Sequence, residues 1–148
     1  MPQIVVIRHP RENLKKCSLR GLESHENFAF FKAKDGFLFD ATGYILLQNN
    51  APEISEKDKG LPILLLDSTW ALLPKVRNKI HGKPILRGLP SSIKTAYPRV
   101  SKSGNDPQNG LATVEALFAA LSLSGQRDES VLQNYIFKDT FLQLNKGL

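Results

Sequence analysis

The sequence predicts an α/β domain with a small β-rich part at its N-terminus. Residues 62–67 contain four consecutive large apolar residues and end in an acid, which is typical of a strand covered on both faces in a parallel sheet. Apolar residues recur at helical spacing over residues 70–80 and again over Thr113–Leu123. Strands and helices therefore alternate along the second half of the chain, which is the pattern of α/β domains.

The first fifty residues are predicted to be mostly β-structure. Residues 3–8 are apolar and β-branched, which indicates a buried strand. Residues 27–32 and 37–40 flank Asp35-Gly36, a dipeptide suited to a tight turn because both positions tolerate positive φ. We therefore expect a hairpin there, followed by a further strand over residues 44–48.

A polar segment over residues 49–60 separates the two parts of the chain and is predicted to be a loop or a short helix. We accordingly expect a β-rich N-terminal subdomain in residues 1–50 and an α/β domain in residues 61–148.

Four elements are expected after the apolar strand. A helix begins at Pro74, because proline is tolerated in a first helical turn, and a short strand covers residues 84–86. The helix over Thr113–Leu123 ends near Gly125. Asp128 is expected to cap a final helix to about Asn145 that buries Val131, Leu132, Tyr135, Ile136 and Leu142.

Composition excludes several classes of protein. The chain has 148 residues and is 41% hydrophobic, which suits one domain with its own core. Its apolar runs are too short to cross a bilayer, so no membrane partner is expected. Cys17 is the only cysteine, which excludes an internal disulfide and a cysteine-based zinc cluster. This cysteine usage favours a reducing, cytoplasmic location.

Basic residues are concentrated in two segments of the chain. Five lie between Arg8 and Arg20, and eight more lie between residues 68 and 105, where there is no Asp or Glu. These segments hold thirteen of the twenty Lys and Arg residues, and the net charge is +6. Such segregation favours a polyanion such as RNA as partner, although a solvated basic face without a ligand would give the same pattern.

Asp67-Ser68-Thr69-Trp70 follows the buried strand directly. Open α/β sheets bind ligands at the carboxyl ends of their strands, so these side chains are placed for a site. A structural role explains them equally well, with Asp67 or Thr69 capping the next helix and Trp70 packing beneath it.

This tetrapeptide resembles the motif of the DTW-domain proteins, uridine aminocarboxypropyltransferases that act on tRNA. The wider pattern is still more similar to their relatives in ribosome biogenesis, which modify small-subunit rRNA. Those relatives have a Lys-Lys-Cys-Thr/Ser element, here residues 15–18, and an Arg-x-Leu-Pro element, here residues 87–90. A Leu-Ser/Ala-x-x-Glu-Ala helix start corresponds to residues 111–116, and the resemblance covers residues 4–123.

The resemblance implies a SPOUT-like fold, a knotted α/β domain that binds S-adenosylmethionine. It implies that Leu66 and Asp67 approach the ribose and amino-acid end of this cofactor, and that the Ser18 amide binds its carboxylate. Trp70 and Leu73 would then enclose the S-methyl group, while Leu86 and the loop containing Tyr97 and Ser101 would hold adenine. The set of residues implied at the cofactor is Ser18, Leu66, Asp67, Trp70, Leu73, Leu86, Tyr97 and Ser101.

The implied reaction is transfer of the aminocarboxypropyl group to a uridine or pseudouridine base, with methylthioadenosine released. Asp67 is the candidate catalytic residue, as a base or a hydrogen-bonding orienter for the uracil N3–H. The expected partner is rRNA or a pre-ribosome before tRNA, contacted through Lys15, Lys16, Arg20, Lys94, Arg99 and Lys102. Residues 96–104 depart from the loop sequence of the ribosomal relatives.

Other interpretations remain open at this stage. The same fold could methylate RNA, or it could serve as a non-catalytic RNA-binding module in ribosome assembly. The spacing of His9, Cys17 and His25 gives a weak metal hypothesis, and Cys17 could be a thiol nucleophile, although a buried structural cysteine is commoner. Glu115 either complements a helix dipole or serves the site. The phenylalanines between residues 28 and 39 either stack RNA bases or form core, which is the commoner place for such side chains.

Overall fold

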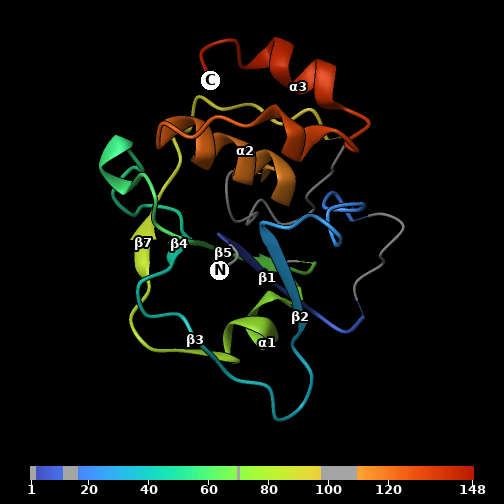
Figure 1. The fold of residues 1–148 in the computed structure, drawn as a ribbon, viewed down its shortest axis with the longest axis vertical. Helices are drawn as coiled ribbons and strands as arrows, with labels where there is room; N and C mark the ends of the chain where they lie inside the picture. Colours follow the sequence, from blue (N-terminus) through green and yellow to red (C-terminus); the bar gives the residue numbers. More distant parts are fainter. Residues whose placement is uncertain (1–2, 12–16, 70, 98–109) are drawn as a thin grey trace.

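The centre of the fold is a five-stranded sheet in which every strand is parallel to its neighbours. The computed structural model describes residues 3–11, 17–69, 71–97 and 110–148. The strand order is β2-β1-β5-β4-β7 (Figure 1). The prediction of an α/β domain is confirmed, and the strands expected in residues 3–8, 44–48, 62–67 and 84–86 are all present. The bounds are Ile4–Arg8 for β1, Phe28–Lys32 for β2, Ile45–Leu47 for β4, Ile63–Asp67 for β5 and Ile85–Arg87 for β7.

Both faces of this sheet are covered. The α2 face carries α2 (Thr113–Leu123), the 3-10 turn η3 (Glu129–Leu132) and α3 (Lys138–Leu144) (Figure 1). The α1 face carries α1 (Leu73–Arg77) and a small parallel sheet of β3 (Phe39–Asp40) and β6 (Ile80–His81). A second 3-10 turn, η1 (Glu56–Asp58), precedes β5. Successive strand residues alternate between these faces, so Ile4 and Val6 join one core while Val5 and Ile7 join the other.

The predicted hairpin is wrong, although its turn exists. Gly36 has a φ of +84°, and Phe37 N–H donates to Lys34 C=O across 3.0 Å. The flanking strands nevertheless do not pair with each other, because β2 pairs with β1 and β3 pairs with β6. Five residues of β2 run parallel to β1 and bury Phe28, which a two-residue β3 could not match. The Asp35-Gly36 dipeptide correctly predicts where the chain turns, but it does not predict which strands pair.

The final helix is shorter than expected. Asp128 is a cap, since its carboxylate accepts from Ser130 N–H at 3.0 Å, but the element it begins is the short turn η3. A second start at Lys138 gives α3. Because the helix is interrupted between these two elements, Ile136 does not face the core and is 85% exposed. Val131, Leu132 and Tyr135 are buried as predicted, and Leu142 is partly buried.

The two parts of the chain expected on either side of residues 49–60 contribute strands to the same sheet. β1, β2 and β4 come from residues 1–50, and β5 and β7 come from residues 61–148. β5 lies directly between β1 and β4. Within the described ranges, no helix combines the length and the hydrophobicity needed to cross a membrane.

The packing of α2 leads to a first prediction. Phe118 is fully buried and meets Phe141 edge-on, with ring centroids 6.2 Å apart. Phe118→Ala should therefore lower the free energy of unfolding by about 3–5 kcal/mol, measured by urea denaturation. Ile136→Ala, at an exposed position, is the matched control and should change it by less than about 0.5 kcal/mol. Equal effects in the two variants would contradict this account of the core.

Candidate functional site

A buried ion pair stands at the carboxyl ends of two adjacent central strands. The register of β1 and β5 places Arg8 beside Asp67, and both side chains point to the α2 face. Arg8 Nε donates to Asp67 Oδ2 across 2.9 Å, and the two residues are 7% and 4% exposed. The guanidinium also lies 4.8 Å from the centre of the Phe30 ring and 3.5 Å from Glu23 Oε1. Asp67 thus lies at the predicted edge of the sheet, with its charge neutralised by a neighbour.

Cys17 joins this pair from a segment fifty residues away in sequence. Its Sγ donates to Asp67 Oδ2 across 2.9 Å, and Arg8 Nη2 donates to the sulfur across 3.3 Å. Burial, with the adjacent charge of Asp67 and the hydrogen bond to it, raises the pKa of the Cys17 thiol to about 12. Burial alone would lower the pKa of Arg8, but its bonds to Asp67 and Cys17 outweigh that effect and raise it. The site therefore holds a charged guanidinium and a neutral thiol.

Ser18 connects the same segment to α2. The residue at the N-cap of α2 is Ala112, which has no side-chain oxygen to satisfy the first backbone amides. Ser18 Oγ supplies one instead, accepting from Val114 N–H across 3.1 Å. Cys17 and Ser18 together tie the ends of β1 and β5 to the start of α2.

Glu115 is the centre of a second group of buried hydrogen bonds, at the start of α2. Its side chain is fully buried, so its carboxylate must be satisfied by protein donors. Its Oε1 accepts from Ala112 at the start of α2 and from Thr95 in the loop before it, and its Oε2 accepts from Ala96 in that loop and from Tyr135 after η3. The partners are Thr95 Oγ1 at 2.6 Å, Ala96 N–H at 2.9 Å, Ala112 N–H at 2.8 Å and Tyr135 O–H at 2.9 Å. The structural role considered for Glu115 fits this position, since it caps the start of α2 and also fixes a loop, while a role at the site stays a prediction.

The expected cofactor residues fall on both faces of the sheet. Leu66 and Leu86 are half-buried and pack against the core of the α1 face, whereas Asp67 lies on the α2 face. Tyr97 is half-buried on the α2 face, 5.8 Å from the Phe137 ring. Leu73 is half-buried at the first position of α1, and Trp70 and Ser101 lie outside the described residues.

The expected RNA-binding lysines and arginines are only partly covered by the structure. Arg20 and Lys94 are exposed. The backbone of Lys94 is clamped by Asn145, which accepts from its N–H and donates to its C=O, both at 2.8 Å. Lys15, Lys16, Arg99 and Lys102 lie outside the described residues.

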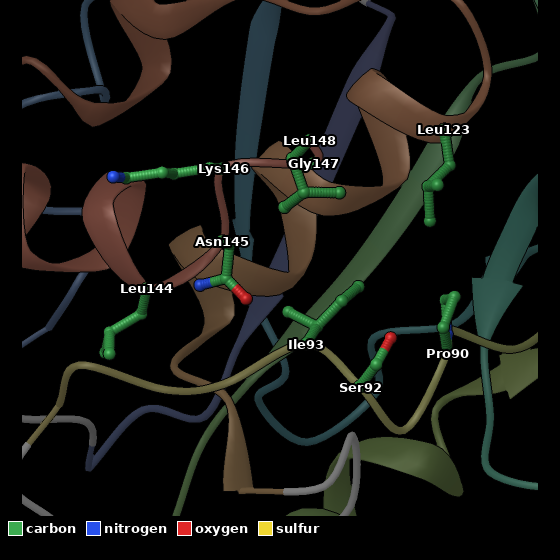
Figure 2. A pocket seen from close by; sticks show the side chains of 9 residues that line it. All are labelled: Pro90, Ser92, Ile93, Leu123, Leu144, Asn145, Lys146, Gly147 and Leu148. Carbon is green, nitrogen blue, oxygen red and sulfur yellow. The ribbon is translucent and has the colours of Figure 1, made fainter.

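Asn145 also borders a cavity of about 290 Å³ between α3 and the loop after β7 (Figure 2). Its wall includes Ile93, Leu123 and Leu144, but none of the residues of the Arg8–Asp67–Cys17 cluster. This cavity is therefore a separate feature from the sheet-edge site.

The structure does not support a metal site at His9, Cys17 and His25 or a nucleophilic role for Cys17. His9 Nδ1 accepts from Arg11 N–H and His25 Nδ1 from Asn27 N–H, so each histidine is engaged locally and neither joins Cys17. Among the residues that the structure covers, no group of three or more His, Cys, Asp or Glu is placed to hold a metal ion. The raised pKa of Cys17 argues against a thiolate nucleophile.

Sequence reasoning missed Arg8 and Glu23 as parts of the site. Arg8 was grouped with the surface cations, because a strand-end arginine next to a basic segment looks solvent-exposed. The available signal was positional: Arg8 ends one apolar strand as Asp67 ends the other, so parallel pairing brings the two charges together.

No protein-family profile matches the sequence, and no curated protein sequence matches it significantly. Among solved structures, the chain is similar to the SAM-dependent rRNA:acp-transferase Tsr3 from Vulcanisaeta distributa. The match has a TM-score of 0.70 and 25% sequence identity, and it covers 99% of this chain and 80% of that one.

A double-mutant cycle tests whether Arg8 and Asp67 act as a buried pair. Arg8→Gln and Asp67→Asn should each lower the free energy of unfolding, and the double variant should lose less than the sum. We expect a coupling of at least about 1.5 kcal/mol by urea denaturation, because each single change leaves the other charge buried alone. The exposed Arg127–Glu129 pair is the control, and its coupling should be indistinguishable from zero. Similar coupling in both pairs would contradict the burial argument.

The state of Cys17 is tested by its reactivity. At pH 8 its thiol is protonated and buried, so the native protein should resist a disulfide reagent such as dithionitrobenzoate. In urea the thiol regains an ordinary pKa near 8.5 and should react completely. Because the folded state favours the protonated thiol, this contribution to stability is present below pH 8.5 and declines as the pH rises toward 12. Rapid labelling of the native protein at pH 8 would show that the thiol is not held as described.

Proposed function

We propose that this protein transfers the aminocarboxypropyl group of S-adenosylmethionine to a uridine-type base of rRNA and releases methylthioadenosine. The observation that carries the proposal is the similarity to the SAM-dependent rRNA:acp-transferase over nearly the whole chain. The positions of the motif segments support it. The Cys17-Ser18 element hydrogen-bonds both to Asp67 and to the start of α2, although these segments are 50 and 96 residues apart.

The residues at this edge fit such a cofactor. Leu66, Leu73 and Leu86 are half-buried apolar side chains, each with some exposed surface that could cover an apolar group. The backbone N–H of Ser18 donates to no group in the described part of the chain, so it is available to a carboxylate. We propose that these residues and Tyr97 bind S-adenosylmethionine, with Trp70 and Ser101 added from the resemblance.

When bound, the cofactor supplies a sulfonium with three electrophilic carbons, and the carbon that faces the base is transferred. The task of the protein is to place the base in line with the correct carbon, and such placement can lower the barrier by several kcal/mol. For Asp67 we favour the orienting role over that of a base. Its Oδ2 already accepts hydrogen bonds from Arg8 and Cys17, which hold the carboxylate in a fixed position.

The same proposal includes three predictions about the fold, the RNA substrate and the location of the protein. The first is the SPOUT-like knotted fold, which rests on the resemblance of the sequence motifs. The second is the choice of rRNA or a pre-ribosome over tRNA. The third is a cytoplasmic location.

The test is incubation of the purified protein with S-adenosylmethionine and bulk cellular RNA, followed by mass analysis of nucleosides and cofactor products. We expect methylthioadenosine together with a uridine-type nucleoside that carries the aminocarboxypropyl mass. S-adenosylhomocysteine with a methylated nucleoside would instead identify a methyltransferase. No cofactor consumption, together with salt-dependent RNA binding, would identify a non-catalytic assembly module.

A further inference from the structure

The segment that follows β7 depends on distant side chains for its backbone hydrogen bonds. Residues 94–97 form neither a strand nor a helix, so their backbone groups need partners from elsewhere in the chain. These partners come from α2, from the end of α3 and from within the segment itself. Tyr97 ends this segment and is one of the residues proposed to bind S-adenosylmethionine.

Asn145, at the C-cap of α3, clamps the start of this segment. It is 9% exposed, and its side-chain amide accepts from Lys94 N–H and donates to Lys94 C=O, both across 2.8 Å. The amide nitrogen also donates to Phe141 C=O across 2.9 Å, so both of its N–H groups are used. Figure 2 shows this amide pointing toward the loop that carries Ile93. A buried asparagine thus joins α3 to a residue 51 positions away.

Thr95 holds the rest of the segment. Its hydroxyl donates to Glu115 Oε1 across 2.6 Å and accepts from Tyr97 N–H across 3.0 Å. Ala96 N–H donates to the same carboxylate across 2.9 Å. The Tyr97 ring meets the Phe137 ring edge-on, with centroids 5.8 Å apart. The backbone and the ring of Tyr97 are therefore both fixed.

The helix start that anchors this segment also anchors the candidate site. Ser18 Oγ accepts from the α2 backbone one residue before Glu115, and the cysteine that precedes Ser18 donates to Asp67. The start of α2 is therefore tied to the ends of the central strands on one side and to residues 94–97 on the other. Asn145 adds a second tie, from α3.

We propose that Thr95 and Asn145 are positioning residues for S-adenosylmethionine, which act by holding residues 94–97 in the conformation that receives it. This inference rests on the proposed function, because it takes the cofactor as given. A segment that is already ordered pays less entropy when a ligand binds, so its ties contribute to affinity without contacting the ligand. The proposal gives α3 a role in cofactor binding, although none of the residues proposed at the cofactor lies on that helix.

The experiment compares isosteric variants of the full chain by calorimetric titration with S-adenosylmethionine. Thr95→Val keeps the shape of the side chain and removes its hydroxyl, and it should weaken binding by about fivefold or more, the value of one hydrogen bond. Thr95→Ser keeps the hydroxyl and should stay within about twofold of the parent protein. Asn145→Asp keeps the size of the side chain but cannot donate to Lys94 C=O, so it should weaken binding as Thr95→Val does.

Val131→Ala is the matched control for a loss of stability alone. Val131 is buried in η3, so this variant should lower the free energy of unfolding while its cofactor affinity stays within about twofold. In all variants, RNA affinity and turnover at saturating cofactor should stay near the parent values, because only the cofactor concentration needed changes. Equal weakening of cofactor binding in Val131→Ala and Thr95→Val would overturn the positioning role.

Amide hydrogen exchange without cofactor gives a second readout. Tyr97 N–H should exchange slowly in the parent protein and in Thr95→Ser, and faster in Thr95→Val, which lacks its acceptor. If the parent protein binds S-adenosylmethionine and Thr95→Val and Asn145→Asp bind it as tightly, the positioning role is wrong and the proposed function stands. If the parent protein binds no S-adenosylmethionine, the proposed function is overturned and the positioning role with it.

Discussion

The pairing of Arg8 with Asp67 is the constraint on which the rest of the site depends. Two charges withdrawn from water at the ends of adjacent strands are tolerated only while each faces the other. A shift of β1 against β5 by one residue would separate them and turn each alternating side chain to the wrong face. The pair therefore fixes the register of the sheet at its centre. It also draws in the segment that carries Cys17, whose thiol donates to Asp67 and accepts from Arg8 and from Leu19 N–H.

Glu115, on the helical side of the sheet, is a second buried charge that is tolerated only because it has partners. A fully buried carboxylate needs donors, and the chain provides them from the loop before α2, from the helix start and from the segment after η3. The two carboxylates are linked through Cys17 and Ser18, since one of these residues bonds Asp67 and the other bonds the first turn of α2. Polar groups that are costly to bury thus hold together segments that the apolar core alone would leave free to slide.

The strongest local patterns predicted their elements well. The apolar strand at β5 and the helix α2 were expected within a residue of their observed bounds. A short uninterrupted apolar run is typical of a buried strand, and apolar residues at helical spacing are typical of a helix packed on a core. The partner of β2 was predicted wrongly, because a turn signal says nothing of a strand that lies twenty residues upstream. Asp67 was found from its place at a strand end, whereas Arg8 was not, because its partner is set by pairing across the sheet. Thr95, Ala96 and Tyr135 were not foreseen as donors to Glu115, because these three residues lie 19 or 20 positions from it and only the fold brings them together.

The order of the strands has a consequence for how this protein is made. β4 leaves the ribosome before β5, yet in the sheet β5 stands between β4 and β1. A nascent chain can therefore assemble only β1 and β2, and β4 must wait without a neighbour until residues 63–67 emerge and insert. Parallel contacts across such sequence separations give a high contact order and slow folding. The complete sheet cannot form before β5 is in place, and loss of β5 would separate β1 and β2 from β4 and β7, whereas loss of β7 would remove only an edge strand.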